Sequence, residues 1–167
     1  MAITRLNNNS ITSVTALPSG CTSASGLSLG KVLQIQNNII SGVTTHASSS
    51  FIDLVTQTIT PTSSSNKILI MAGIGEIDQL DGRVGTKILR NGTDLGADAK
   101  VCGEVGRNLG YSGTEDHIGS EGMVAYLDSP STTSQITYKL QINSGNSGTI
   151  RINNGSASRL FLYEIAN

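Results

Sequence analysis

The absence of helical periodicity constrains the fold of this chain more than any other feature. In 167 residues, no window places apolar side chains at positions i, i+3, i+4 and i+7 over three turns. The apolar residues instead form short runs rich in Ile, Val, Thr, Leu and Tyr, which clusters of Gly, Asn, Ser and Asp separate. This pattern is typical of an all-β domain. The predicted strands are Lys31–Asn37, Phe51–Thr60, Lys67–Ile77, Val84–Arg90, Met123–Asp128, Gln135–Asn143, Thr149–Asn153 and Arg159–Ala166.

The segments between these strands contain specific turn signals. Asn91-Gly92 predicts a tight hairpin, because both residues tolerate a positive φ. Pro130 predicts the end of a strand, where no backbone donor is needed. From Leu95 to Glu121 the chain is rich in glycine and charge, and we predict one short strand around Val101 inside long exposed loops.

The predicted strands are of two kinds. Gln135–Asn143 and Thr149–Asn153 alternate between apolar and polar residues, which indicates one dry face and one wet face. Lys67–Ile77, Met123–Asp128 and Arg159–Ala166 are apolar on both faces, and such strands need cover on both.

A second copy of the chain is the simplest cover for the second apolar face, because no helix is available. We therefore predict a two-sheet antiparallel β-sandwich in which one sheet is solvated and the other is buried in an oligomer. The alternative is that the apolar strands are central strands flanked by loops. The residues predicted to contact other copies are Leu69, Met71, Phe161, Tyr163 and Ile165.

The sequence pattern of strands and turns resembles that of small structural proteins of tailed bacteriophages, particularly marine ones. The resemblance is carried by "YLDSPSTTSQITYKLQI", the terminal "LFLYEIA", "FIDLVTQTITPTSSSNKILIMAGIG" and the opening "ITRLNNNSITSVTALPSG". Those proteins are similar to the trimeric jelly rolls of the tumour-necrosis-factor and complement-C1q type, whose inner sheet surrounds a three-fold axis and includes the last strand. The resemblance implies a jelly-roll head over residues 31–167 and a homotrimer. The few aromatic residues of this chain depart from better-known members.

The first 30 residues are predicted to form an extended docking arm. They contain no acid and only one basic residue, Arg5. Such a segment satisfies its backbone by adding a strand to another protein, at little desolvation cost. A disordered tail is the alternative. The spaced aliphatic residues predicted to anchor the arm to the particle are Leu6, Ile11, Val14 and Leu17.

No catalytic, cofactor or metal site is predicted. Ser112, Glu115, Asp116 and His117 are neighbours in a glycine-rich loop, where a nucleophile, a base and an orienting acid rarely converge. "DQLDG" offers Asp78 and Asp81, but it lacks the calcium-loop pattern and is interpreted as an acidic turn. Cys21 and Cys102 are not expected to form a disulfide, because the opening is not an export signal and a reducing compartment is expected.

The function expected from these features is that of a non-enzymatic virion surface protein, made in the host cytoplasm. Its expected partners are two further copies of itself and a major capsid or tail protein. A net charge of −1 gives no basis for nucleic-acid binding, and no segment approaches the length of a membrane span. Chain length favours a capsid decoration or head-fibre protein. The alternatives are a tail-fibre tip that binds a receptor and, more distantly, a carbohydrate-binding module that recognises a host-surface glycan.

Overall fold

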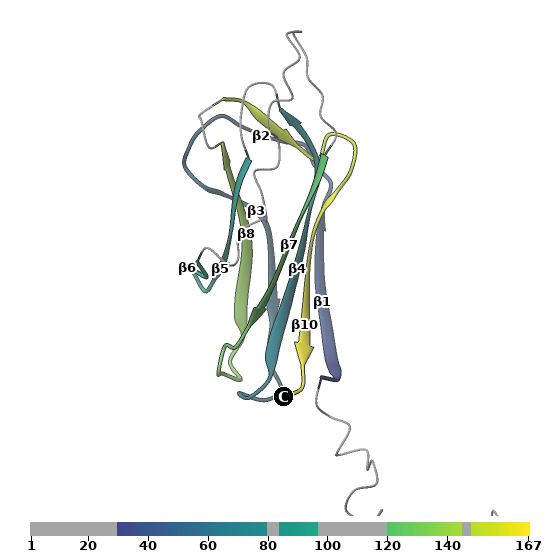
Figure 1. Cartoon of the computed structure of the whole chain (residues 1–167), viewed down its shortest axis with the longest axis vertical. Helices are drawn as coiled ribbons and strands as arrows, with labels where there is room; N and C mark the ends of the chain where they lie inside the picture. The colour runs from purple at the N-terminus through teal and green to yellow at the C-terminus, as the bar shows by residue number, and fades with distance from the viewer. Residues whose placement is uncertain (1–29, 80–83, 97–119, 145–147) are drawn as a thin grey trace, which may run out of the picture.

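The structure is a computed structural model that describes residues 30–79, 84–96, 120–144 and 148–167. In these ranges all helical or strand structure is β, and two antiparallel sheets pack face to face as a β-sandwich (Figure 1). The first sheet contains β1 (Val32–Ile40), β2 (Thr44–His46), β4 (Lys67–Gln79), β7 (Ser120–Asp128), β9 (Ile150–Ile152) and β10 (Ser158–Ile165). The second contains β3 (Ile52–Ile59), β5 (Val84–Arg90), β6 (Thr93–Asp94) and β8 (Ile136–Ser144).

All eight strands predicted from the sequence are confirmed, with ends that shift by up to three residues. Two short strands were not predicted, β2 and β6, because three and two polar residues carry no periodic signal. The all-β fold class and the two-sheet antiparallel sandwich are therefore correct.

In the first sheet, β9 and β10 together form one interrupted strand, and so do β1 and β2. Ile77 of β4 pairs with Ser120 of β7 on one side and with Ile152 of β9 on the other. Because β10 also pairs with β4 on the side opposite β7, β9 and β10 continue one another across residues 153–157. β1 and β2 do the same across residues 41–43, since β1 pairs with β10 and β2 with β9. The sheet is thus β1/β2, β10/β9, β4 and β7 in order.

Side-chain hydrogen bonds hold the interruption between β9 and β10 against β4. The Glu76 amide donates to Ser156 Oγ at 2.6 Å, and the Gly75 amide donates to Ser158 Oγ at 3.0 Å. Ser158 Oγ in turn donates to Asn153 Oδ1 at 2.6 Å. A Cβ at residue 75 would meet the carbonyl oxygen of Ser156 and Asn153 Oδ1, so the close approach of the two segments requires glycine there.

The distinction between the two kinds of strand is confirmed. β8 alternates between buried and half-buried residues and lies in the second sheet. The three strands that are apolar on both faces, β4, β7 and β10, lie together in the first sheet. β9 also belongs to the first sheet although it alternates, because it continues β10.

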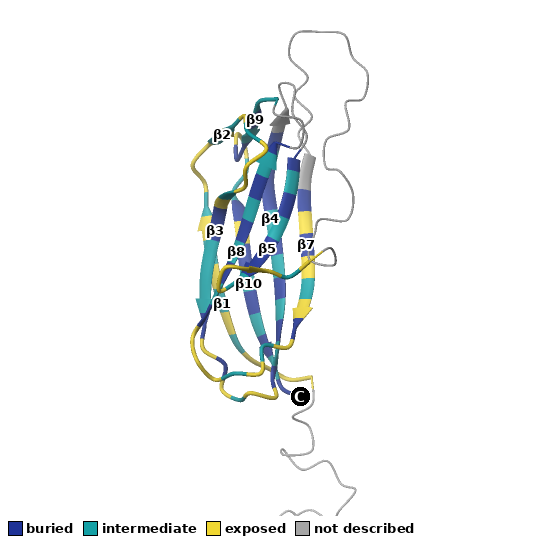
Figure 2. Cartoon of the chain, turned by 90° about the vertical axis from the view of Figure 1, so that its left-hand side faces the viewer, coloured by how far each residue is buried: buried dark blue, intermediate teal, exposed yellow. Residues whose placement is uncertain are grey.

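The hydrophobic core fills the space between the sheets. β4 and β10 contribute one of their two apolar faces to it, and β8 contributes its apolar side (Figure 2). Among the residues that the structure describes, Tyr138 of β8 is the largest fully buried side chain. The other core side chains that are 0 % exposed include Ile68, Ile70, Ile77, Ile88, Ile136, Leu140, Ile142, Leu160 and Leu162.

The predicted hairpin at Asn91-Gly92 joins β5 to β6. Asn91 and Gly92 have φ of 49° and 86°, the left-handed conformation that this two-residue turn requires. Asn91 Oδ1 accepts a hydrogen bond of 2.8 Å from the Thr137 amide, and the Asn91 amide donates to the Thr137 carbonyl at 2.8 Å. The turn is therefore fixed to the neighbouring strand β8.

Other predictions lie outside the described residues. The docking arm predicted over residues 1–30 lies outside them except for Gly30, and so do its anchor residues Leu6, Ile11, Val14 and Leu17. The short strand predicted around Val101 and the two cysteines, Cys21 and Cys102, also lie outside them. The same holds for the polar loop residues Asp81, Ser112, Glu115, Asp116 and His117.

Candidate interaction face

The first sheet packs one face against the core and turns the other away from it. We call the side chains of β1, β4, β7 and β10 that point away from the core the outer face. Residues paired across antiparallel strands share a face, so the pairing aligns these side chains in rows. Three rows cross the four strands: Ile35, Tyr163, Leu69 and Leu127; Asn37, Phe161, Met71 and Ala125; and Ile39, Arg159, Gly73 and Met123.

The five residues predicted to contact other copies lie together on the outer face. Within a single chain each is only half buried. The rings of Phe161 and Tyr163 stack along β10, with centroids 6.2 Å apart and an interplanar angle of 26°. The structure thus brings together, on two neighbouring strands, side chains that the sequence separates: Leu69, Met71, Phe161, Tyr163 and Ile165.

β1 has its apolar side turned away from the core. Gln34 Nε2 donates to Glu164 Oε2 at 2.6 Å, and Asn38 Nδ2 donates to the Thr56 carbonyl of β3 at 2.9 Å. These amides therefore point inward, which reverses the usual pattern of a sandwich strand. The alternating aliphatic side chains point outward into solvent: Leu33, Ile35 and Ile39.

Large apolar side chains remain exposed on both edge strands of the outer face. On β7, Met123 is 64 % exposed and Leu127 is 50 % exposed (Figure 2). On β1, Ile35 is 54 % exposed, and Leu33 and Ile39 are exposed to a similar degree. Single exposed aliphatics are common on protein surfaces, but a contiguous apolar patch indicates an interaction site.

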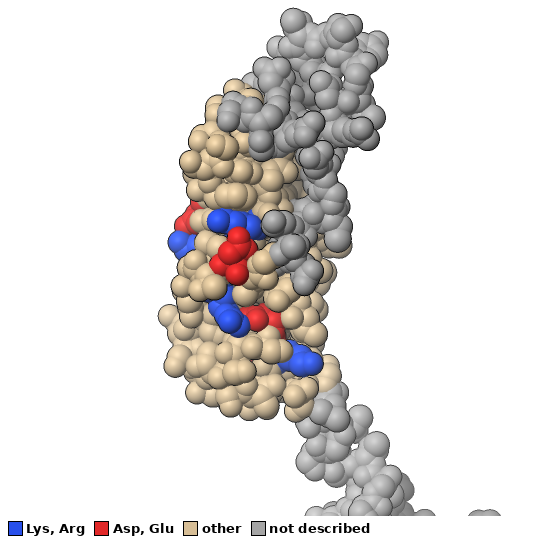
Figure 3. Space-filling view, turned by 60° about the vertical axis from the view of Figure 1, so that its left-hand side comes forward, with Lys and Arg blue, Asp and Glu red and all other residues tan. Residues whose placement is uncertain are grey.

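The outer face contrasts with the exposed side of the second sheet in its charge. In the rows between Lys67 and Gly73, its described charged residues are Lys67 and Arg159. On the side of the molecule that carries β5, β6 and β8, charges of both signs lie close together (Figure 3). There Lys139 Nζ lies 2.6 Å from Asp53 Oδ2, and this pair lowers the pKa of Asp53. The exposed side of the second sheet therefore carries paired charges of both signs, whereas the outer face carries few charges.

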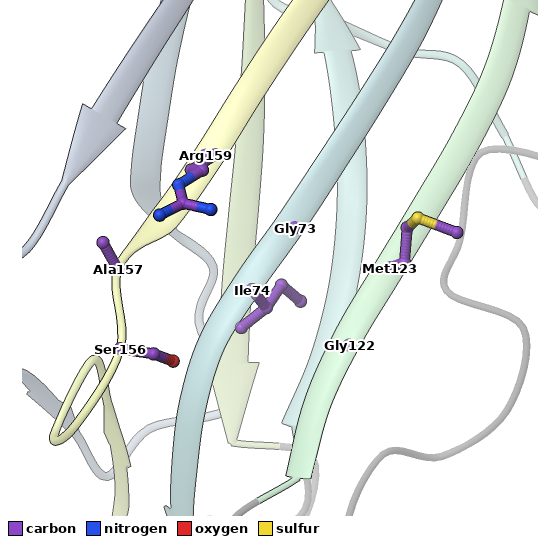
Figure 4. Close-up of a pocket in the computed structure, with 7 residues that line it drawn as sticks. All are labelled: Gly73, Ile74, Gly122, Met123, Ser156, Ala157 and Arg159. Carbon is purple, nitrogen blue, oxygen red and sulfur yellow. The ribbon is translucent and has the colours of Figure 1, made fainter.

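A notch interrupts the third row of the outer face at Gly73. Arg159 and Met123, which pair with Gly73 from either side, form its walls together with Ser156 and Ala157 (Figure 4). Gly73, Ile74 and Gly122 complete the lining, and the space measures about 350 Å³. Arg159 is exposed, and no acidic partner for its guanidinium is found among the described residues.

A buried acid fixes β1 and β10 behind the outer face. Glu164 is 0 % exposed, and its carboxylate accepts hydrogen bonds from Gln34, Asn66 and the amide and hydroxyl of Thr62, at 2.6 to 2.8 Å. Burial raises the pKa of Glu164, but the hydrogen bonds from Asn66, Gln34 and Thr62 outweigh it, so the pKa lies below its usual range. The carboxylate therefore stays ionised and ties the loop after β3 to both strands.

A second buried acid connects the two sheets. Asp128, at the end of β7, accepts a hydrogen bond of 2.6 Å from the Tyr138 hydroxyl of β8. Arg90 Nη1 of β5 lies 2.8 Å from Asp128 Oδ1 and 3.0 Å from Oδ2. Burial, together with the hydrogen bond to Asp128 and its negative charge, raises the pKa of Tyr138 above its usual range.

The described chain begins and ends at the same end of the sandwich (Figure 1). The Gly30 amide donates to the Ala166 carbonyl at 2.9 Å, and the Ala166 amide donates to the Lys31 carbonyl at 2.9 Å. Gly30, where the described part of the chain begins, therefore lies beside the C-terminus. β2 and the turn that joins β9 to β10 lie toward the opposite end.

The described residues offer few groups for chemistry. Across residues 30–79, 84–96, 120–144 and 148–167, no three His, Cys, Asp or Glu side chains are placed to hold a metal ion. His46 Nε2 lies 2.8 Å from the Ser50 carbonyl, which gives this histidine a local structural contact. No helix within those ranges is long and apolar enough to cross a membrane.

Sequence reasoning missed the two buried acids and the reversed orientation of β1. A signal for the acids was present, because Glu164 alternates in register with Leu160 and Leu162, and Asp128 with Val124. Strict period two places both carboxylates on the core side. The orientation of β1 had a weaker signal, since amides and aliphatics alternate equally well with either side inward.

The chain was also compared with known proteins. A scan against protein-family models finds no match, and a search of curated proteins finds no related sequence.

Proposed function

We propose that the chain is a non-enzymatic bacteriophage virion surface protein of the capsid-decoration or head-fibre type. In this proposal three copies join through their outer faces to form a head. The N-terminal residues attach the head to a capsid or tail protein of the particle. The observation that carries the proposal is the outer face itself, above all β1, which turns Ile35 and Ile39 outward and the amides of Gln34 and Asn38 inward.

The exposed apolar residues supply a driving force for association. Burying a large aliphatic side chain contributes roughly 1.5–3 kcal/mol. Five exposed apolar side chains of the two edge strands are each about half exposed, so covering them contributes roughly 4–7 kcal/mol per chain: Leu33, Ile35, Ile39, Met123 and Leu127. Phe161, Tyr163 and Met71 add to this sum. The outer face presents little charge between Lys67 and Gly73, so its desolvation costs little there.

The strand order supports the jelly-roll interpretation. When β1 and β2 count as one strand and β9 and β10 as another, the sheets are ordered β1, β10, β4, β7 and β3, β8, β5, β6. Successive strands alternate between the sheets except at the β5–β6 hairpin. Eight antiparallel strands in two sheets, with connections that cross from one sheet to the other, are the arrangement of a jelly roll. This order agrees with the family that the sequence resembles.

The position of Gly30 supports attachment through the N-terminal residues. Gly30 and Lys31 are hydrogen-bonded to Ala166 at one end of the sandwich. An arm that docks there leaves the opposite end free to project from the particle. An extended arm with aliphatic residues at intervals binds by adding a strand to a sheet edge, with those residues seated in pockets.

Particles of the phage that encodes this chain, prepared without it, test the proposal. The full chain is added back and compared with a variant in which Leu6, Ile11, Val14 and Leu17 are all replaced by Ser. A matched control replaces Ser10, Thr12, Ser13 and Thr15 by Ala. We expect the wild type and the control to bind to the particles and the variant that lacks the four aliphatic residues not to bind. We also expect cryo-EM to locate a three-fold density on the particle. Equal binding by all three proteins would contradict the docking arm, and failure of the wild type to bind would contradict the virion function.

A further inference from the structure

Neither the backbone conformation nor the described surroundings of position 73 within a single chain require glycine there. Its φ is not in the left-handed region, and a Cβ built on it would meet no atom within 4 Å. Gly75 and Gly85 differ, because a Cβ at either would collide with Asn153 or Asn143. Glycine inside a strand lowers stability, and it often marks a place where another molecule approaches closely.

The notch at Gly73 lies inside the apolar rows of the outer face. The two neighbouring rows carry Met71, Phe161 and Tyr163, and Met123 beside the notch is the most exposed large apolar residue described, at 64 %. A surface that covers Met71 and Met123 therefore also covers the notch. An empty space of about 350 Å³ left under the covering surface would forfeit packing contacts, so a side chain of that surface has to fill it.

We propose that the notch formed by Gly73, Met123 and Arg159 receives an apolar side chain from the outer face of a second copy of this chain. This inference rests on the proposed association through the outer faces and names the point at which two copies interlock. A second copy is the occupant because its outer face supplies exposed aliphatic side chains in the same row spacing, and because the area to be covered is largely apolar on both surfaces. The Arg159 guanidinium lies on the rim, where it can bind backbone carbonyl groups of the entering strand.

A substitution that fills the notch from within the chain distinguishes a role of Gly73 in association from a role in folding. Gly73→Leu places a side chain where the single chain has open space, so the fold remains intact and gains β-propensity. In the assembly the same side chain occupies the space of the entering residue. Overpacking of this kind raises the concentration of half-dissociation by about tenfold or more. Gly73→Ala fills the notch less and gives a smaller shift in the same direction.

Light scattering over a concentration series, with circular dichroism as the check of folding, is the measurement. The matched control is Gly42→Leu, because a Cβ at Gly42 also meets nothing within 4 Å and Gly42 lies between β1 and β2, outside the three rows. We expect wild type and Gly42→Leu to associate alike and Gly73→Leu to be a folded, weakly associating chain. Unchanged association of Gly73→Leu would overturn the notch while leaving self-association intact. A wild type that never associates would overturn both proposals together.

Oxidation of Met123 by dilute hydrogen peroxide gives a second measurement that does not depend on the folding of a leucine variant. Met123 is exposed in the single chain. We expect its oxidation, followed by mass spectrometry of the peptides, to slow as the wild-type concentration rises through the association range, because susceptibility to oxidation follows exposure. The same rate in dilute and concentrated protein would contradict burial of the notch.

Discussion

Replacing Tyr138 by Phe tests the buried connection between the two sheets. The substitution removes one hydroxyl from a fully buried ring and leaves the packing of that ring in place. The lost hydrogen bond, 2.6 Å to Asp128 Oδ2, has a charged acceptor, and such bonds contribute about 1.5–3 kcal/mol. Arg90 Nη1 still lies 3.0 Å from the same oxygen, so the acceptor is not left alone. We therefore expect a loss near the lower end, about 1.5–2 kcal/mol at pH 7.

The same substitution has a pH dependence whose sign follows from the raised pKa of Tyr138. An unfolded tyrosine loses its proton near pH 10, whereas the folded chain holds the proton of Tyr138 to higher pH. The stabilisation is therefore complete below pH 10 and is lost above it, at about 1.4 kcal/mol per pH unit. Tyr138→Phe lacks this loss, so the two unfolding free energies should converge near about pH 11 to 11.5.

Urea unfolding of the wild type and Tyr138→Phe, at pH 7 and at steps from pH 9.5 to 11.5, measures both effects. Tyr126→Phe is the matched control, because Tyr126 packs against the same core and no hydrogen bond of its hydroxyl to another described residue is found. We expect the control to stay within about 0.5 kcal/mol of wild type at all pH values. A difference between wild type and Tyr138→Phe that stays constant through pH 11.5 would refute the assigned buried hydrogen bond.

The remaining predictions concern Glu164 and the glycines of β4. Glu164→Gln should cost roughly 1–3 kcal/mol at pH 7, because an amide cannot accept all the hydrogen bonds that converge on the carboxylate. Since the pKa of Glu164 is lowered in the folded chain, this stabilisation is present above about pH 4.3 and fades as the pH falls. The unfolding free energies of variant and wild type should therefore converge at about pH 3, and a difference that stays constant between about pH 7 and pH 3 would contradict the role of Glu164. Gly75→Ala should cost about 1–3 kcal/mol because its Cβ meets backbone, whereas Gly73→Ala should cost nothing; equal thermal stability of the two variants would contradict the close approach of residues 156–157 to Gly75.

The strands were predictable from the sequence because their signals are local. "QITYKLQIN" shows its wet and dry sides residue by residue, and Asn91-Gly92 marks its own turn. The two-faced strands were also predictable as a group, because apolar residues at consecutive positions require cover on both sides. The structure places all three of them in one sheet.

The features that escaped prediction depend on pairing between distant segments. Glu164 is satisfied by Gln34, Thr62 and Asn66, and no local pattern names those donors. The notch at Gly73 exists because Arg159 and Met123 pair with Gly73 from two different strands, which is a matter of register. The joining of β9 to β10 depends on hydrogen bonds from β4 to Ser156 and Ser158, which the turn-like sequence conceals.

Self-association through the outer face is the central claim, and the mass of the full chain in solution tests it most directly. Light scattering should give three times 17.4 kDa for wild type. Phe161→Asp and Ile35→Asp should give 17.4 kDa with unchanged circular dichroism, because a buried unpaired carboxylate costs several kcal/mol. Thr137→Asp, on the solvated side of β8, is the control and should keep the wild-type mass. A wild-type chain that unfolds cooperatively but stays at 17.4 kDa at every concentration would contradict the claim.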